Sequence, residues 1–139
     1  MTIPLRLLAQ DSEDLLVISA ALQDSVAKIG DIRFEAKGRR LTIGLNRYRW
    51  ETGSADRVRS VLQVGSVLSV QSQRLRGTAK DAVVEVLSVG FEPGEAPGGE
   101  LSIAFSGNGN LRVSVECVDA ILADVSGSWP AKGIPKHDL

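Results

Sequence analysis

Cysteine and histidine are almost missing from this sequence of 139 residues. Cys117 is the single cysteine, so no disulfide can form within the chain, which is typical of a protein in a reducing compartment. One cysteine and one histidine, His137, cannot supply the nitrogen and sulfur ligands of an ordinary zinc site. We therefore expect no metal site of that kind.

Long apolar runs and catalytic signatures are also missing. No stretch approaches the roughly 20 apolar residues of a membrane-spanning helix, and the short apolar N-terminus turns acidic at Asp11, unlike a secretory signal. The sequence has no phosphate-binding loop, no dinucleotide-binding glycine turn and no Gly-x-Ser-x-Gly elbow. From these absences we expect a cytoplasmic protein without membrane contact, and we assign no catalytic residue and no cofactor.

What is present is typical of one folded domain. Hydrophobic residues make up 43% and charged residues 24% of the chain, which are ordinary values for a globular protein. A chain of this length buries a sizeable core without disulfides or metals. We expect a single domain over residues 1–126 and a loosely ordered tail over 127–139, where two prolines lie among mixed charges.

Most of the chain has the two-residue period of half-buried strands. One helix is expected over 11–23, capped by Asp11 or Ser12, with Leu15, Ile18 and Leu22 facing a sheet. After it, apolar residues alternate with polar ones in eight or nine short strands, and the Ser-Gly-Asn-Gly-Asn segment at 106–110 predicts a hairpin turn.

These elements predict an α+β fold. We expect a mainly antiparallel sheet, curled as a half-barrel or arranged as a sandwich, with the N-terminal helix and a short C-terminal helix over 118–125. A pleckstrin-homology-like barrel closed by that last helix is an alternative, although the early helix fits it poorly.

The charge distribution is the one anomaly. The formal net charge is −1, but residues 33–80 contain eleven basic and three acidic residues, a net of +8, and the remainder carries −9. Nine of the eleven basic residues are arginine, whose planar guanidinium suits phosphates and carboxylates.

Part of this charge gathers around one expected hairpin. On a strand, Arg47 and Arg49 share one face, and Tyr48 and Trp50 share the other. If residues 51–56 form the turn, Arg57 and Arg59 return opposite them. Depending on the register, either four arginines cluster on one face or two stack beside the aromatic rings.

Two interpretations of the basic segment stay open. The arginines can pair with acids such as Glu85, Glu116 or Asp119, within one chain or between two copies in a homo-oligomer. Alternatively, Arg47, Arg49, Trp50, Arg57 and Arg59 form an anion-binding surface for a phosphate-bearing ligand, RNA or an acidic protein. The protein would then be a non-catalytic binding module, assisted by Glu92 and Glu95 in the Pro/Gly-rich loop 92–99.

An enzyme is the alternative to a binding module. It would act on an anionic small molecule with an unconventional site built from Arg, Glu and the C-terminal His137. That site requires the C-terminal segment to fold back over the arginines, because a general base must be held within hydrogen-bonding distance of its target.

Several separate blocks of sequence also carry a family resemblance. They are the segments at 7–24, 45–51, 67–72, 91–99 and 115–117, in this order along the chain. With them the chain resembles a family of small bacterial proteins, mainly alphaproteobacterial, that is known only as a domain of unknown function. The resemblance spans nearly the whole chain and implies one full-length domain, without implying an activity.

Overall fold

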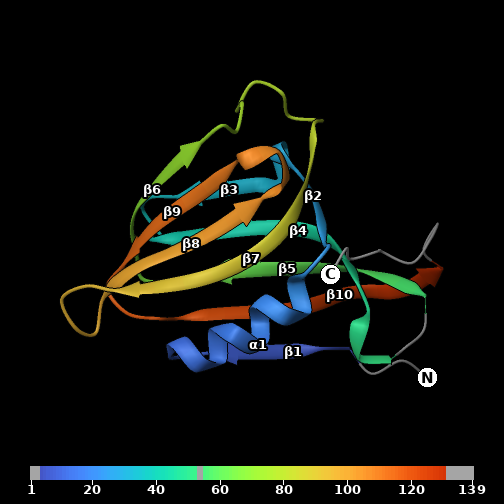
Figure 1. Ribbon diagram of the computed structural model, residues 1–139, viewed down its shortest axis with the longest axis horizontal. Coiled ribbons are helices and arrows are strands. Elements are labelled where there is room, and N and C mark those ends of the chain that lie inside the picture. The colour runs from blue at the N-terminus through green and yellow to red at the C-terminus, as the bar shows by residue number, and fades with distance from the viewer. Residues whose placement is uncertain (1–3, 53–54, 131–139) are drawn as a thin grey trace.

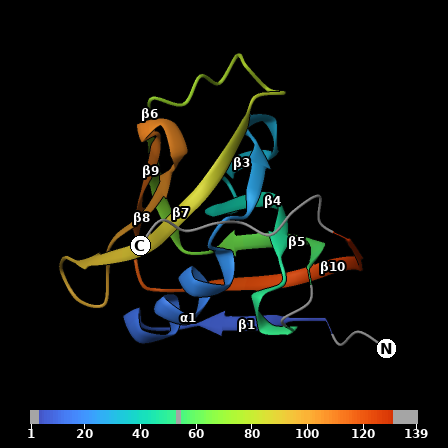
Figure 2. The same cartoon turned by 45° about the vertical axis from the view of Figure 1, so that its right-hand side comes forward.

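Ten strands form one connected, antiparallel sheet, and an α-helix packs at one end of it (Figures 1 and 2). The computed structural model describes residues 4–52 and 55–130. The expected α+β class with a mainly antiparallel sheet is confirmed. The strands are β1 (Arg6–Ala9), β2 (Val26–Lys28), β3 (Ile32–Glu35), β4 (Arg40–Tyr48), β5 (Asp56–Val64), β6 (Val67–Gln73), β7 (Val83–Pro93), β8 (Gly99–Phe105), β9 (Asn110–Val115) and β10 (Ala120–Pro130).

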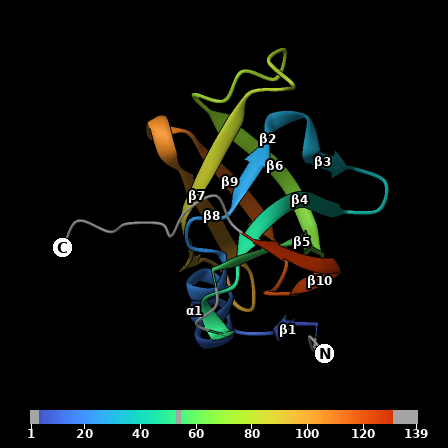
Figure 3. The ribbon, with the colours of Figure 1, turned by 90° about the vertical axis from the view of Figure 1, so that its right-hand side faces the viewer.

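The sheet curls around its interior without closing (Figure 3). Its strand order is β1-β10-β5-β4-β2-β7-β8-β9-β6, and β3 pairs beside this path with β4. The short 3-10 helix η1 (Ile29–Asp31) separates β2 from β3, so β4 pairs with both of them. Because the described part of β3 pairs with β4 alone, the side of the sheet between β3 and β6 stays open.

The helix α1 (Ser12–Leu22) begins where the sequence predicts. Asp11 is the N-cap, and its side chain accepts a hydrogen bond from the backbone N–H of Asp14 at 2.8 Å. Leu15, Ile18 and Leu22 are buried against the sheet, as their spacing indicates. The hydroxyl of Ser19 accepts a hydrogen bond from the backbone N–H of Val89 at 2.9 Å, which ties the helix to β7.

The alternating apolar residues form one continuous core. In β4, Leu41, Ile43 and Leu45 are buried, and the same period in β8 and β9 buries the side chains that face them across the curled sheet. No helix in the described part of the chain is long and apolar enough to cross a bilayer.

The expected helix over 118–125 is wrong. This segment leads into β10, an 11-residue strand that lies between β1 and β5. Val118, Ala120 and Leu122 are buried at every second position, and Ile121 and Ala123 are half-buried. Neighbouring strands pair with both edges of β10 and make it a strand. The pleckstrin-homology-like alternative required a C-terminal helix that closes the barrel, and this segment does not form one.

The C-terminal end of the chain is described in part. β10 extends to Pro130, with an irregular register between Asp124 and Ser128. The rest of the expected tail, including His137, lies outside the described residues.

Candidate ligand-binding site

The β4–β5 hairpin sets where the arginines of the basic segment lie. Its register pairs Tyr48 with Arg57, Arg47 with Val58 and Asn46 with Arg59. Neighbouring residues on a strand point to opposite faces, so Arg47 continues the face of Leu41, Ile43 and Leu45 into the core. The four-arginine cluster is therefore not formed, and Arg57 lies on the aromatic face instead.

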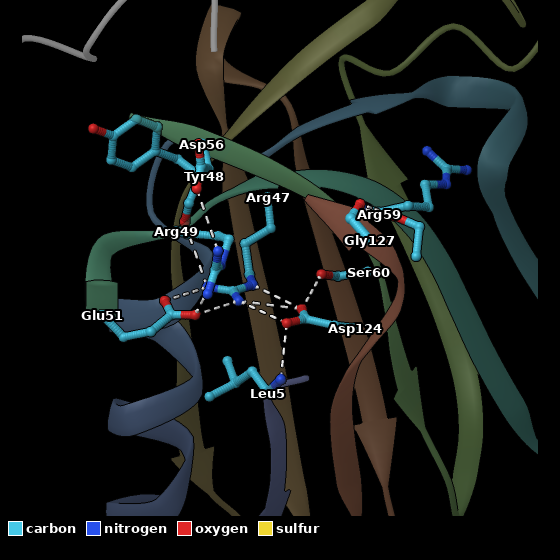
Figure 4. Close-up of polar contacts among 11 residues, drawn as sticks. Leu5, Arg47, Tyr48, Arg49, Glu51, Asp56, Arg59, Ser60, Asp124 and Gly127 are labelled. Atoms are coloured by element: carbon cyan, nitrogen blue, oxygen red, sulfur yellow. Dashed lines mark hydrogen bonds and ion pairs between the residues drawn. The ribbon is translucent and has the colours of Figure 1, made fainter. Parts of the chain in front are cut away.

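Arg47 is the largest fully buried side chain of the described residues and lies in a network of carboxylates (Figure 4). Its Nη1 and Nη2 donate to the two carboxylate oxygens of Glu51 at 2.8 and 2.7 Å. Its Nε and Nη2 donate to Asp124 at 3.1–3.2 Å. Asp124 also accepts hydrogen bonds from the hydroxyl of Ser60 at 2.6 Å and from the backbone N–H of Leu5 at 2.8 Å.

Hydrogen bonds fix the charge states of this network. Burial opposes the charge of Arg47, but its hydrogen bonds to Glu51 and Asp124 outweigh that cost and raise the pKa of the guanidinium. Burial also disfavours the charged form of Asp124, and the hydrogen bonds from Arg47, Ser60 and Leu5 still lower its pKa. The pKa of Glu51 is lowered mainly by its hydrogen bonds from Arg47. All three groups are therefore charged at neutral pH, and the network joins β4, β10 and the 3-10 helix η2 (Trp50–Thr52).

Arg49 and Trp50 also contact their own chain. Arg49 is buried, and its Nη1 donates to the carboxylate of Asp56 at 3.3 Å. The indole Nε1 of Trp50 donates to the backbone oxygen of Gln23 at 2.8 Å, which connects η2 to the end of α1. The position of Trp50 beside Tyr48, with ring centroids 4.4 Å apart, agrees with the expected aromatic face.

Arg57 and Arg59 lie on the other face of the hairpin from Arg47. The guanidinium carbon of Arg57 is 5.9 Å from the centroid of the Tyr48 ring, so one of the two arginines expected beside the aromatic rings lies there. Arg59 donates to the amide oxygen of Asn46 at 3.3 Å and to Asp31 at 3.0 Å. Gly44 makes this position possible, since a Cβ there would lie 2.5 Å from an Nη atom of Arg59.

Arg59 borders a recess of about 560 Å³ on this face, which we call the basic recess. Three cationic side chains line it, those of Lys28, Arg59 and Lys80, together with the carboxylates of Asp31 and Asp81 and the amide of Asn46. Arg59 is paired with Asp31, whereas Lys28 and Lys80 are in no ion pair with a described residue. The recess is thus lined by two exposed lysines without an ion pair and by one carboxylate residue, Asp81, that has no cationic partner among the described residues.

The Pro/Gly-rich loop lies elsewhere on the molecule. Glu92 and Glu95 are exposed and line a separate recess of about 630 Å³, next to Glu100, Arg112 and Glu116. Glu100 pairs with Arg112 at 2.8 Å and Glu116 pairs with Arg39 at 2.6 Å. The structure does not bring Glu92 or Glu95 to the basic recess.

Sequence reasoning foresaw part of this arrangement. Glu116 was one of the expected arginine partners, but Asp124, the buried partner of Arg47, was missed because its segment was interpreted as a helix. Nothing in the sequence marks Lys28 as a site residue, since it simply ends a three-residue strand. Lys80 belongs to the basic segment, but no sequence pattern indicates a function for it. Lys28 and Lys80 line the same recess because η1 and the chain before β7 lie side by side, where the backbone N–H of Gly30 donates to the oxygen of Lys80 at 2.9 Å.

Comparison with known proteins gives a family without an activity. A family model described as a protein of unknown function (DUF2948) matches residues 5–137. No curated protein and no solved structure matches the chain.

Proposed function

This chain belongs to the DUF2948 family of unknown function, and from that premise we propose that it is a non-catalytic binding module for a small anionic ligand. The ligand would carry a phosphate or carboxylate group and would bind in the basic recess. The observation that carries this proposal is the approach of Lys28 and Lys80 to Arg59 around one concave volume, with neither lysine in an ion pair among the described residues.

The form of the recess favours a small ligand over RNA or an acidic protein. Its volume of about 560 Å³ falls within the range of roughly 300–1,000 Å³ that is usual for small-molecule sites. Lysine ammonium groups attract anions as point charges, and their attraction is stronger in a concave surface than on an open one. Asn46 adds a polar side chain whose oxygen is already held by Arg59, which leaves its amide nitrogen as a donor.

The site that we propose includes only part of the expected one. Arg59 stays in it, and Arg57 lies on the same strand face, two residues away. Arg47 and Arg49 contribute to the stability of the hairpin, because their guanidinium groups are buried against Glu51, Asp56 and Asp124. A ligand that competed for Arg47 would have to displace two carboxylates of the chain itself.

Nuclear magnetic resonance with inorganic phosphate as the probe tests this proposal. We expect saturable shifts of the backbone amide signals of Gly30, Asn46 and Lys80, and we expect them to shrink as salt is added, because exposed charges are screened. The variant Lys28→Ala with Lys80→Ala should lose these shifts.

The matched control is Arg33→Ala with Lys37→Ala, which also removes two exposed cations, from β3 and the hairpin after it. It should respond to phosphate as the wild-type protein does. Equal responses of the two double variants, or no saturable shift at the recess in the wild-type protein, would overturn the proposal.

A further inference from the structure

The open side of the sheet, between β3 and β6, leads to an apolar cavity. One backbone hydrogen bond connects the two sides at one end, from the N–H of Val67 to the oxygen of Arg39 at 2.9 Å. Beyond it, the described residues of β3 pair with β4 and those of β6 pair with β9, so the two facing strand edges stay apart. The cavity between them has a volume of about 310 Å³.

Apolar side chains of the core form the walls of this cavity. Leu41 of β4 and Leu111 of β9 are buried and line it from the interior. Ile32 and Phe34 line it from β3, and Val70 lines it from β6. Phe34 points to the core side of its strand, opposite Leu41, and yet is 41% exposed, because no strand covers it there. Filling this cavity would remove apolar surface from water, which is favourable.

The apolar cavity and the basic recess are neighbours. Gly30 and Lys80 line both of them, so the N–H of Gly30 and the oxygen of Lys80, which are hydrogen-bonded, lie where the two volumes meet. The connection between β6 and β7, drawn at the top of Figure 1, carries Lys80 and also contributes Leu75 and Gly77 to the apolar cavity. A lysine residue, Lys80, therefore borders the apolar volume, and a second lysine, Lys28, lines the adjoining recess.

We propose that the ligand is a medium-chain aliphatic molecule with an anionic head, such as a fatty acid of roughly eight to ten carbons. The chain would enter between β3 and β6 and lie against Leu41, Val70 and Leu111, and the carboxylate would lie at Lys80, at the edge of the basic recess. This inference rests on the proposed anion-binding function and adds the class of the ligand. The cavity is near the lower limit of small-molecule sites, which favours a medium chain over a long one.

A series of fatty acids from butanoate to decanoate tests the inference by titration calorimetry. Each methylene that enters the cavity should tighten the dissociation constant roughly fourfold, until the cavity is full and the series levels off. Lys80→Ala should weaken octanoate binding by up to about fivefold at low salt and leave 1-octanol unaffected, since the alcohol has no charge.

Two matched variants on β6 test where the aliphatic chain of the ligand binds. Ser72 is exposed and lines the cavity, whereas Ser69 is exposed and points to the opposite face of the strand from Val70. The Ser72→Phe variant should no longer bind octanoate, because the phenyl ring fills the cavity. The Ser69→Phe variant should bind octanoate as tightly as the wild-type protein does. Both proteins should keep the phosphate response of the basic recess.

The outcomes separate the two proposals. If octanoate binds no more tightly than butanoate, or if Ser72→Phe and Ser69→Phe bind it equally, the inference is overturned. In that case the phosphate shifts at Gly30 and Lys80 still decide the proposed function independently. The chain-length series uses the wild-type protein, so its result does not depend on the folding of any variant.

Discussion

Arg47 has a buried charge that two carboxylates balance. Its side chain is fully buried, and that of Asp124 is 3% exposed, so both groups have lost nearly all of their hydration. Such a loss costs several kcal/mol for each ion, and it is offset where the geometry is good and further hydrogen bonds satisfy the remaining atoms. Ser60 and the N–H of Leu5 supply those further bonds to Asp124.

Removing Arg47 alone should strongly destabilise the protein. We expect Arg47→Met to lower the free energy of unfolding by about 3–5 kcal/mol, because Asp124 is left buried without its cation. Adding Asp124→Asn should recover part of this loss, since the neutral amide oxygen can still accept from Ser60 and Leu5. Urea unfolding of the two single variants and the double variant measures the coupling energy between Arg47 and Asp124. Purely additive losses of unfolding free energy would contradict the predicted interaction.

Acid should weaken the same network. The folded-state pKa values of Asp124 and Glu51 lie below their ordinary values of 3.8 and 4.5, so the stabilisation is complete above these values and is lost as the pH falls through the lower, folded-state values. Arg47 stays protonated throughout, because its pKa is raised. We expect the stability difference between wild type and Arg47→Met to stay constant well above pH 4.5 and to narrow as the pH falls below about 4.5 in urea unfolding. A difference that does not narrow at acid pH would contradict the assignment.

At the scale of elements, α1 and β10 show where local sequence decides structure and where it does not. The start of α1 is encoded locally, because the capping side chain of Asp11 and the apolar stripe lie within one short segment. The segment 118–125 is a short apolar run whose pattern fits a helix or a strand equally. Its pairing with β5 and β1, which are distant in sequence, makes it a strand.

The N-cap of α1 should contribute measurably to the free energy of unfolding. Asp11→Ala should lower the free energy of unfolding by about 1 kcal/mol, because the N–H of Asp14 loses its acceptor. Ser12→Ala is the matched control one residue later, and its side chain is exposed at the start of the helix. Thermal unfolding followed by circular dichroism compares the two variants, and equal effects would show that Asp11 is not the cap.

Two hairpin turns contain residues with positive φ angles. The hairpin at 106–110 is confirmed, with positive φ angles of 75° at Gly107 and 64° at Asn108. In the hairpin between β3 and β4, Arg39 and not the neighbouring Gly38 adopts a positive φ, at 51°. The backbone oxygen of Arg39 accepts from Val67, and this long-range bond accompanies the unusual conformation.

In the whole molecule, part of the central positive charge is neutralised within the chain. Arg39 pairs with Glu116, Arg47 with Asp124 and Arg59 with Asp31, each joining the basic segment to its acidic flanks. Lysines and arginines without an ion pair among the described residues include Arg33, Lys37, Arg74, Arg76 and Lys80. The exposed cations of the β6–β7 connection therefore give the open side of the sheet a positive border.

Two of these pairs have the same separation in sequence, 77 residues, and differ in burial. The side chains of Arg39 and Glu116 are 58% and 51% exposed, so water and salt screen their attraction. We expect Arg39→Ala to change the free energy of unfolding by less than about 1 kcal/mol, against the much larger effect of Arg47→Met. Urea unfolding of both variants in one buffer makes the comparison, and similar losses would refute the role of burial.

The sequence by itself determined the class of the fold, the capped helix, most strands and the surplus of arginine at the centre, because these follow from local periodicity and composition. The tertiary structure alone decided which arginines are buried and which face a recess. A strand register and the pairing of β10 place Arg47 beside Asp124, and the approach of η1 to the chain before β7 places Lys80 at both cavities. Contacts between residues far apart in sequence depend on how the sheet curls, and no local pattern carries that information.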